Sequence, residues 1–305
     1  MLMRSWCVRV PSCDGERVRQ SLIEKGLLNR TCRIRTDGEY LLIPTNEPVD
    51  GSLVEEFTCN SEKKVLPRFE QVGGIAIMQE DDTQGAQEIL ASKSSYHTVL
   101  FAESAVEGEF RTKKFTVLAG ENRTSTEYTE YGHHFTIDLQ QAYFSPRLSG
   151  ERQRILQMMQ KGERVVDMFA GVGPFAITMA EKASIVYAGD LNPGAVILMT
   201  RNIQKNHSGN VVPILADAMH LPGIISKQAD RIIMNLPLHA SPFLPAAFQL
   251  CRPGGTIHLY ALVKKEDELV DLIHQYPVQD IGMKYVRSYS PDQFHMVYDI
   301  ITANF

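Results

Sequence analysis

Two glycines and three acidic side chains in the second half of the sequence are spaced as they would be in a nucleotide-binding site. Asp167 ends a short apolar run, and Gly171 and Gly173 follow it before a helical pattern begins near Phe175. A glycine-rich turn between a strand and a helix lets the backbone approach a ligand and directs helix N–H groups toward it. Structural turns use the same residues, so this turn alone decides little.

Carboxylates also follow the next two apolar runs. Asp190 is placed to accept hydrogen bonds from the two ribose hydroxyls of an adenosyl ligand. Asp190 or Asn192 could instead cap a helix that starts at Pro193, and both roles are compatible if Asn192 caps and Asp190 binds. Asp217, after the third run, can reach the exocyclic amine of adenine. Three such strand ends at one edge of an open sheet predict an adenosyl cofactor.

Two features argue against a dinucleotide such as NAD. The third glycine of the Gly-x-Gly-x-x-Gly fingerprint is missing, because Ala176 occupies its position. The fourth apolar run ends in Asn235-Leu-Pro237, which offers an amide and backbone carbonyls in a rigid arrangement. Amino-group methyltransferases place planar nitrogens near the methyl donor at this position. An ordinary exit from a strand is the alternative interpretation.

The elements that must position these residues follow a βαβα pattern from residue 149 onward. Six short apolar runs predict strands with helical segments between them: 165–166, 185–187, 211–215, 231–234, 256–260 and 297–301. This alternation predicts an α/β domain over 149–305, with a doubly wound, largely parallel sheet.

The first half of the chain predicts two further domains. Residues 1–50 form a small α+β unit with a hairpin around Asp37-Gly38, and 44–51 is a polar, proline-containing linker. Residues 60–148 predict a middle α+β domain with a mixed sheet. The segment Tyr143–Arg152 leads into the last domain. In it, Pro146 precedes a helix over 148–158, whose first turn places Glu151 where the helix dipole favours a carboxylate. A surface glutamate at a helix start is the ordinary alternative.

Bulk properties of the 305 residues indicate a globular protein, with 44% hydrophobic and 22% charged residues. No apolar run reaches the roughly 20 residues of a membrane span, and the N-terminus lacks a secretory signal, so we expect cytoplasmic residence. Five cysteines without a Cys-x-x-Cys pair predict reduced thiols rather than disulfides or a zinc knuckle.

The net charge of −5 argues mildly against a nucleic-acid partner. The objection is weaker for a large folded RNA held by several small basic groups. Candidates for such groups are Arg30, Arg33 and Arg35, and the segment Arg111–Lys114.

With two more motifs, Glu109-Phe-Arg111-Thr-Lys and Arg287-Ser-Tyr-Ser-Pro291 followed by His295, the sequence resembles a known family over nearly its whole length. This is the archaeal and eukaryotic tRNA (guanine-N1)-methyltransferase family, which acts beside the anticodon. The resemblance implies a tRNA-binding N-terminal domain, a middle domain and a Rossmann-like class I methyltransferase domain that binds AdoMet in a bent form. It also implies a target, guanosine 37, and a monomer is expected.

The resemblance further implies roles for individual residues. Glu151 would be the general base and Arg111 would stabilise O6 of the guanine. Asn235 and Pro237 would shape the base site, and Tyr143 would support it. From the residues and the resemblance together, the predicted cofactor contacts are Arg152, Asp167, Phe169, Gly171, Gly173, Pro174, Asp190, Leu191, Asn192, Asp217, Ala218 and Asn235. No metal is required.

The chemistry agrees with these roles, because guanine N1 must lose its proton while negative charge gathers on O6. The closest rival is an aminocarboxypropyltransferase of the wybutosine pathway, which uses the same cofactor. The intact Asn235-Leu-Pro237 and the pair of Arg111 and Glu151 favour methyl transfer. A second activity on a wyosine precursor stays open. A non-catalytic RNA-binding relic and an NAD dehydrogenase are less favoured.

Overall fold

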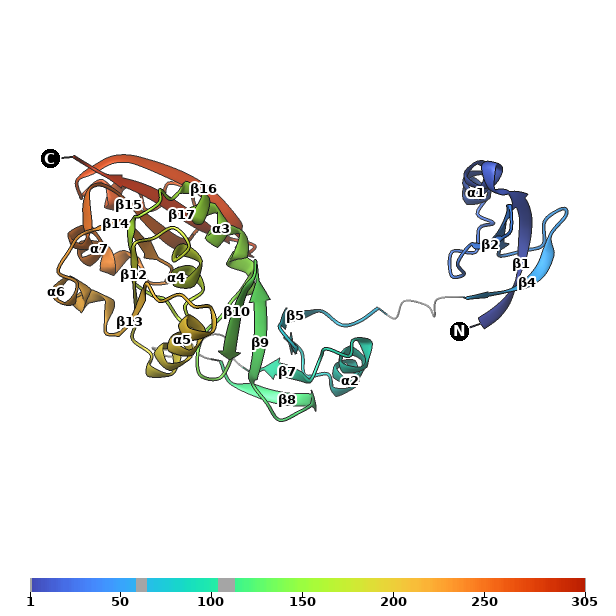
Figure 1. Cartoon of the computed structure of the whole chain (residues 1–305), viewed down its shortest axis with the longest axis horizontal. Coiled ribbons are helices and arrows are strands. Elements are labelled where there is room, and N and C mark those ends of the chain that lie inside the picture. The colour runs from blue at the N-terminus through green and yellow to red at the C-terminus, as the bar shows by residue number, and fades with distance from the viewer. Residues whose placement is uncertain (1, 59–64, 104–112, 305) are drawn as a thin grey trace. The chain divides into compact units, whose positions relative to one another are not determined.

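The computed structural model describes residues 2–58, 65–103 and 113–304, and the chain divides into two compact units, 1–66 and 67–305 (Figure 1). Arg111 therefore lies outside the described residues. Within the described ranges, no helix is long and apolar enough to cross a membrane.

The first unit is a four-stranded antiparallel sheet with one α-helix. Its elements are β1 (Leu2–Pro11), a 3-10 turn (Ser12–Asp14), α1 (Gly15–Glu24), β2 (Arg35–Asp37), β3 (Tyr40–Thr45) and β4 (Leu53–Thr58). The strand order is β2-β3-β1-β4. The predicted hairpin is confirmed, with Gly38 in the left-handed region between β2 and β3.

Two sequence predictions fail in this unit. The supposed linker 44–51 begins inside β3, where Pro44 pairs with Cys7, and β4 beyond it joins the same sheet. Cys32 is disulfide-bonded, whereas Cys7, Cys13 and Cys251 are free thiols. The expectation of reduced cysteines throughout is therefore wrong for Cys32.

The second unit begins with a four-stranded mixed sheet and a separate hairpin. The sheet has the order β5 (Phe69–Val72), β6 (Ile75–Met78), β7 (Thr98–Ala102) and β8 (Phe115–Gly120), with α2 (Thr83–Ser92) packed against it. The hairpin is β9 (Ser125–Glu130) and β10 (His133–Asp138).

Asn202 ties this hairpin to the last part of the chain, because its side chain bonds the backbone N–H and carbonyl of Thr136 at 2.7 and 3.1 Å. A single apolar core continues from Val72 and Phe135 to Val165 and Val297.

The last part of the chain is a seven-stranded sheet with helices on both sides (Figure 1). The strands are β11 (Arg164–Asp167), β12 (Ile185–Asp190), β13 (Val211–Leu215), β14 (Ala229–Met234), β15 (Cys251–Val263), β16 (Val278–Ser290) and β17 (Gln293–Thr302). The helices are α3 (Ser149–Met158), α4 (Pro174–Met179), α5 (Pro193–Lys205), α6 (Leu221–Ile224), α7 (Leu244–Leu250) and α8 (Val270–Ile273), with 3-10 turns at Pro146–Leu148, Ala218–His220 and Ser241–Phe243.

The strand order is β13-β12-β11-β14-β15-β17-β16, in which the first five strands are parallel and β17 and β16 are antiparallel additions. The predicted doubly wound sheet is thus confirmed. The edge strand β16 was not predicted. The order reverses between β12 and β14 on either side of β11, and open α/β sheets bind ligands at the carboxyl ends of strands at such a point.

Candidate active site

A cavity of about 300 Å³ lies at the carboxyl ends of β11 to β14. Eleven of the residues predicted from the sequence line it: Tyr143, Arg152, Phe169, Gly171, Pro174, Asp190, Leu191, Asn192, Asp217, Ala218 and Asn235. His239 and Phe243, which the sequence analysis did not select, also line it. The four strand ends therefore converge on one site, as the order of the motifs predicts.

The glycine-rich turn after β11 owes its shape to two residues in the left-handed region. Gly171 has a φ of 56° and Gly173 a φ of 91°, a backbone conformation that strains residues with a Cβ atom. A Cβ at Gly173 would also meet Met199 Cγ at 3.0 Å. Gly171 lines the cavity, whereas Gly173 does not and instead sets the direction in which α4 starts at Pro174.

Asp190 joins the first two loops of the cavity. Its carboxylate accepts hydrogen bonds from the backbone N–H of Gly171 at 2.7 Å and of Asn192 at 2.9 Å. Burial raises the pKa of Asp190, although these backbone hydrogen bonds act in the opposite direction. The predicted cap is confirmed, since Asn192 Oδ1 accepts from the N–H of Gly194 at 2.9 Å.

The third strand end supplies a second carboxylate and an apolar wall stands beside it. Asp217 accepts from the N–H of Met219 at 2.9 Å and so caps the 3-10 turn that begins at Ala218. The rings of Phe169 and Phe243 meet edge to face, with centroids 5.0 Å apart. A capped loop and two packed rings give the cavity a preformed wall.

Asp167, predicted as a cofactor contact, does not line the cavity. It is fully buried beneath the turn, where it accepts a long hydrogen bond from the N–H of Phe169 at 3.4 Å. Burial penalises its charged form and raises its pKa to about 7. Its position fits a support for the turn rather than a ligand contact.

Arg152 lies between the cavity and the β9–β10 hairpin. Its Nε and Nη2 bond the two carboxylate oxygens of Glu130 at 2.7 and 2.5 Å, and both side chains are almost completely buried. The guanidinium also lies 5.6 Å from the ring centre of Phe175. Arg152 therefore lines the cavity with its charge already neutralised by a partner.

Asn235 and Pro237 of the Asn235-Leu-Pro237 segment have different positions relative to the cavity. Asn235 lines the cavity, and its buried Oδ1 has no hydrogen-bond partner in the described part of the chain. Pro237 does not line the cavity, but its carbonyl accepts from the N–H of Leu262 on β15 at 2.9 Å. The segment thus offers a free acceptor to a ligand from a loop that is fixed to the sheet.

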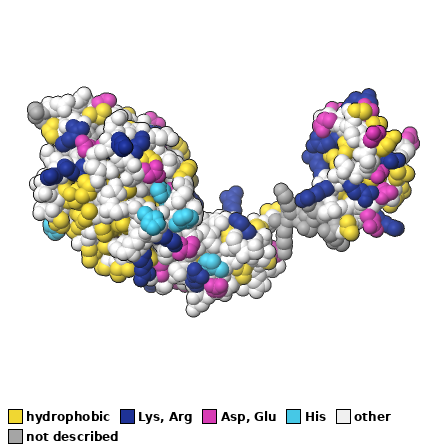
Figure 2. All heavy atoms as spheres, viewed as in Figure 1, with side chains coloured by type: hydrophobic (Ala, Val, Ile, Leu, Met, Phe, Trp, Pro, Cys, Tyr) yellow, Lys and Arg dark blue, Asp and Glu magenta, His cyan; other side chains and the backbone are white. Residues whose placement is uncertain are grey.

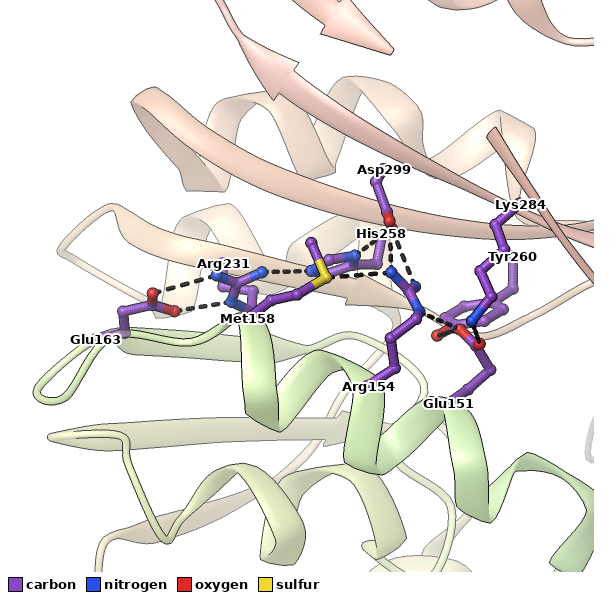
Figure 3. A network of polar contacts seen from close by, with 9 residues as sticks. All are labelled: Glu151, Arg154, Met158, Glu163, Arg231, His258, Tyr260, Lys284 and Asp299. Carbon is purple, nitrogen blue, oxygen red and sulfur yellow. Dashed lines mark hydrogen bonds and ion pairs between the residues drawn. The ribbon is translucent and has the colours of Figure 1, made fainter. Parts of the chain in front are cut away.

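Glu151 lies away from the cavity wall and has three donors of its own (Figure 3). Its Oε1 accepts from Lys284 Nζ at 2.9 Å, and its Oε2 accepts from Arg154 Nε at 2.8 Å and from the Tyr260 hydroxyl at 3.1 Å. Burial would raise the pKa of Glu151, but the hydrogen bonds from Lys284 and Arg154 outweigh it and lower the pKa.

The network around Glu151 continues deep into the sheet (Figure 3). Arg154 bonds both oxygens of Asp299 at 2.6 and 3.2 Å, and Asp299 Oδ1 lies 2.6 Å from Nδ1 of His258. Arg231 donates to Nε2 of the same histidine at 2.6 Å and is itself paired with Glu163 at 2.7 and 3.1 Å. Since an arginine can only donate, His258 Nε2 accepts and its proton lies on Nδ1.

Strand β15 connects Glu151, the predicted general base, with the Asn235-Leu-Pro237 segment, the predicted site of the guanine. Tyr260, a donor to Glu151, is two residues from Leu262, the donor to Pro237. Arg154, Tyr260 and Lys284 were not predicted from the sequence. Only Arg154 had a local signal, one helical turn after Glu151, because the other two come from strands more than one hundred positions later.

The fold and this cavity define a Rossmann-like methyltransferase. Residues 126–280 match the family model of the TRM5/TYW2 methyltransferase domain, and residues 7–54 match that of the tRNA methyltransferase 5 N-terminal domain. The chain belongs to the TRM5/TYW2 methyltransferase family.

Individual relatives refine this assignment. The tRNA (guanine(37)-N(1))-methyltransferase Trm5b of Pyrococcus abyssi is 38% identical over 325 residues, covering 96% of this chain and 97% of the relative. The solved complex of aTrm5 and tRNALeu has a TM-score of 0.78 at 30% identity and covers 97% of this chain and 99% of that one. The tRNA 4-demethylwyosine(37)-methyltransferase Taw21 of Saccharolobus solfataricus is 34% identical but covers only 78% of this chain, and 95% of its own length.

Proposed function

We propose that this chain transfers the methyl group of AdoMet to N1 of guanosine 37 in tRNA. The observation that carries the proposal is the extent of the similarity to the guanine37-N1 enzyme of Pyrococcus abyssi, which spans 96% of the chain. It includes the N-terminal domain matched at 7–54. The 4-demethylwyosine methyltransferase leaves about a fifth of the chain unmatched, which favours the guanosine substrate.

The cavity fits AdoMet on three counts. Its volume is within the range of small-molecule sites, and the unpartnered Oδ1 of Asn235 offers a hydrogen-bond acceptor. The positive φ angles of Gly171 and Gly173 shape a turn in which the backbone of Gly171 can approach a ligand closely. The residues that would hold the cofactor are Arg152, Phe169, Gly171, Pro174, Asp190, Leu191, Asn192, Asp217, Ala218 and Asn235. When bound, AdoMet supplies an electrophilic methyl group.

Glu151 fits the proton-accepting role because it is ionised and outside the cofactor cavity. The N1–H of guanine would donate to the carboxylate, and the proton would pass to Glu151 as N1 takes the methyl group, whose bond to the sulfonium sulfur breaks with the electron pair left on sulfur. Arg111 stabilises the charge that gathers on O6. Tyr143, which lines the cavity, and Asn235 and Pro237 position the base after it has turned out of its stack.

The first unit is proposed to recognise tRNA. Arg35 on β2 and Arg30 and Arg33 in the segment before it are exposed, and Figure 2 shows Lys and Arg side chains on the surface of this unit. Phosphate groups are bound by such side chains. A monomeric enzyme that acts on cytoplasmic tRNA is proposed.

Incubation with isotope-labelled AdoMet and an unmodified tRNA transcript tests the proposal. The expected product is 1-methylguanosine at position 37, identified by nucleoside mass spectrometry and absent from a transcript with adenosine at that position. An aminocarboxypropyl adduct would overturn the proposal in favour of the sister activity. Absence of label from both transcripts would overturn it entirely.

A further inference from the structure

Glu151 is held by two cations that differ in how firmly they are fixed. Arg154 is 17% exposed and bonds Asp299, which is held in turn by His258. Lys284 is 49% exposed at its side chain and reaches Glu151 from the edge strand β16. Lys284 has a flexible four-carbon stem, and moving it breaks its hydrogen bond to Glu151. Moving Arg154 would break its hydrogen bonds to both Glu151 and Asp299.

The two oxygens of Glu151 divide between these holders. Oε2 accepts from Arg154 and from the fully buried Tyr260, while Oε1 accepts from Lys284. The Glu151 side chain is only 7% exposed in this state. A substrate N–H therefore needs Oε1, and Lys284 covers it.

We infer that Lys284 is a displaceable positioning residue, whose ammonium closes Oε1 of Glu151 in the free enzyme and leaves it when the guanine N1–H arrives. The inference rests on the proposed function of Glu151 as base. On departure of Lys284, one positive charge is removed from the carboxylate as the substrate proton reaches it. The base then gains proton affinity at the step that uses it. Arg154 and Tyr260 keep the carboxylate oriented throughout.

The charged and titratable groups around Glu151 come from four elements. They are Arg154 on α3, Tyr260 on β15, Lys284 on β16 and, behind Arg154, Asp299 on β17. Among the hydrogen bonds that lower the pKa of Glu151, that of Lys284 is the largest contributor. Removal of Lys284 leaves Arg154 in place, so the carboxylate keeps one cation and a higher pKa.

The test is the pH dependence of the single-turnover methylation rate in Lys284→Met at saturating AdoMet and subsaturating tRNA, because the profile then reports the free enzyme, in which Lys284 holds Glu151. A general base acts only when ionised, so its pKa sets the acid limb of the profile. In the wild type we expect this limb to lie below the usual carboxylate range, because hydrogen bonds from Lys284 and Arg154 lower the pKa of Glu151. In Lys284→Met we expect the limb to move up by roughly one pH unit, with a plateau at least equal to that of the wild type.

Three comparisons make the result specific. Lys284→Arg should restore the wild-type limb, and Lys161→Met, at an exposed position before β11, should leave it unchanged. A melting temperature of Lys284→Met close to that of the wild type would accompany the expected result. An unmoved limb, or a lower plateau without a shift, would overturn the role of Lys284 while methylation by the wild type upheld the proposed function. Absence of methylation by the wild type would instead remove the function itself.

Discussion

The cofactor cavity and the Glu151 network both bury carboxylates, but they hold them with different donors. In the cavity, Asp190 accepts from the backbone N–H groups of Gly171 and Asn192, and burial raises its pKa. In the network, Glu151 and Asp299 accept from cationic side chains, and their pKa values are lowered. Carboxylates without a protein cation complement a ligand that carries positive charge, such as a sulfonium. A carboxylate already paired with cations must exchange one of them before it can take a proton.

The largest effect should come from the network side, at Glu151. Glu151→Gln keeps the size of the side chain but cannot accept a proton, so the single-turnover rate should fall by about 10²–10⁴. The AdoMet dissociation constant should stay unchanged, because Glu151 does not line the cavity. Rapid-quench kinetics and calorimetry measure the two quantities. A wild-type rate in the variant would show that Glu151 is not the general base. A parallel loss of AdoMet affinity would show that Glu151 also contributes to the cofactor site.

Arg154→Met should lower the free energy of unfolding more than the loss of an exposed ion pair does. Removal of this guanidinium leaves Asp299 and Glu151 short of a cation in a largely buried site, which costs about 3 kcal/mol or more of unfolding free energy. Arg147→Met is the matched control, since its ion pair with Glu70 is half exposed and is worth about 1 kcal/mol at most. Urea denaturation reports both. Equal costs for the two variants would mean that the network does not depend on Arg154.

On the cavity side, Asp190→Ala should weaken AdoMet binding by roughly tenfold to a hundredfold, because one charged acceptor and the tie between two loops are lost. The tRNA dissociation constant should not change. Titration calorimetry with AdoMet and filter binding with tRNA check the two halves of the prediction. An unchanged AdoMet affinity would leave Asp190 as a loop anchor alone.

The same contrast explains how much of the site could be predicted. The cavity residues interact locally: Asn192 N–H donates to Asp190, two positions before it, and the side-chain Oδ1 of Asn192 caps α5 by accepting from the N–H of Gly194. Strand ends, glycines and caps therefore leave a readable pattern. Lys284 lies 133 positions from Glu151 and Asp299 lies 145 positions from Arg154. Such pairs depend on the sheet order and leave no spacing in the sequence.

The fold shows the same limit at two strands. Pro44 suggested a linker, yet its carbonyl accepts from Asn29 on the side away from β1, so its missing N–H faces no strand partner. The edge strand β16 carries many exposed residues, including Met283 and Tyr285, and so lacks the apolar run that marked the other strands of its sheet. The end of β3 and the whole of β16 were missed because the pattern of a strand depends on which of its sides is covered.

The smallest predicted effect concerns the pH dependence of folding stability, which should differ in sign between the two kinds of carboxylate. Burial raises the pKa of Asp167 from 3.8 to about 7, so the folded state holds its proton more tightly than the unfolded state does. Its contribution to stability is complete below pH 3.8 and is lost as the pH rises through about 7. The lowered pKa values of Glu151 and Asp299 have the opposite sign, with stability present at neutral pH and lost as the pH falls.

Asp167→Asn removes the titration while keeping the shape and the polar side chain beneath the turn. Its melting temperature should match that of the wild type near about pH 4 and exceed it by about 2–4 °C near about pH 8. Scanning calorimetry across this range gives the difference directly. Two curves that run parallel from acid to base would mean that Asp167 titrates alike in the folded and unfolded chain. The buried carboxylate beneath the cofactor turn would then be no more strained by its charge than the paired carboxylates of the network.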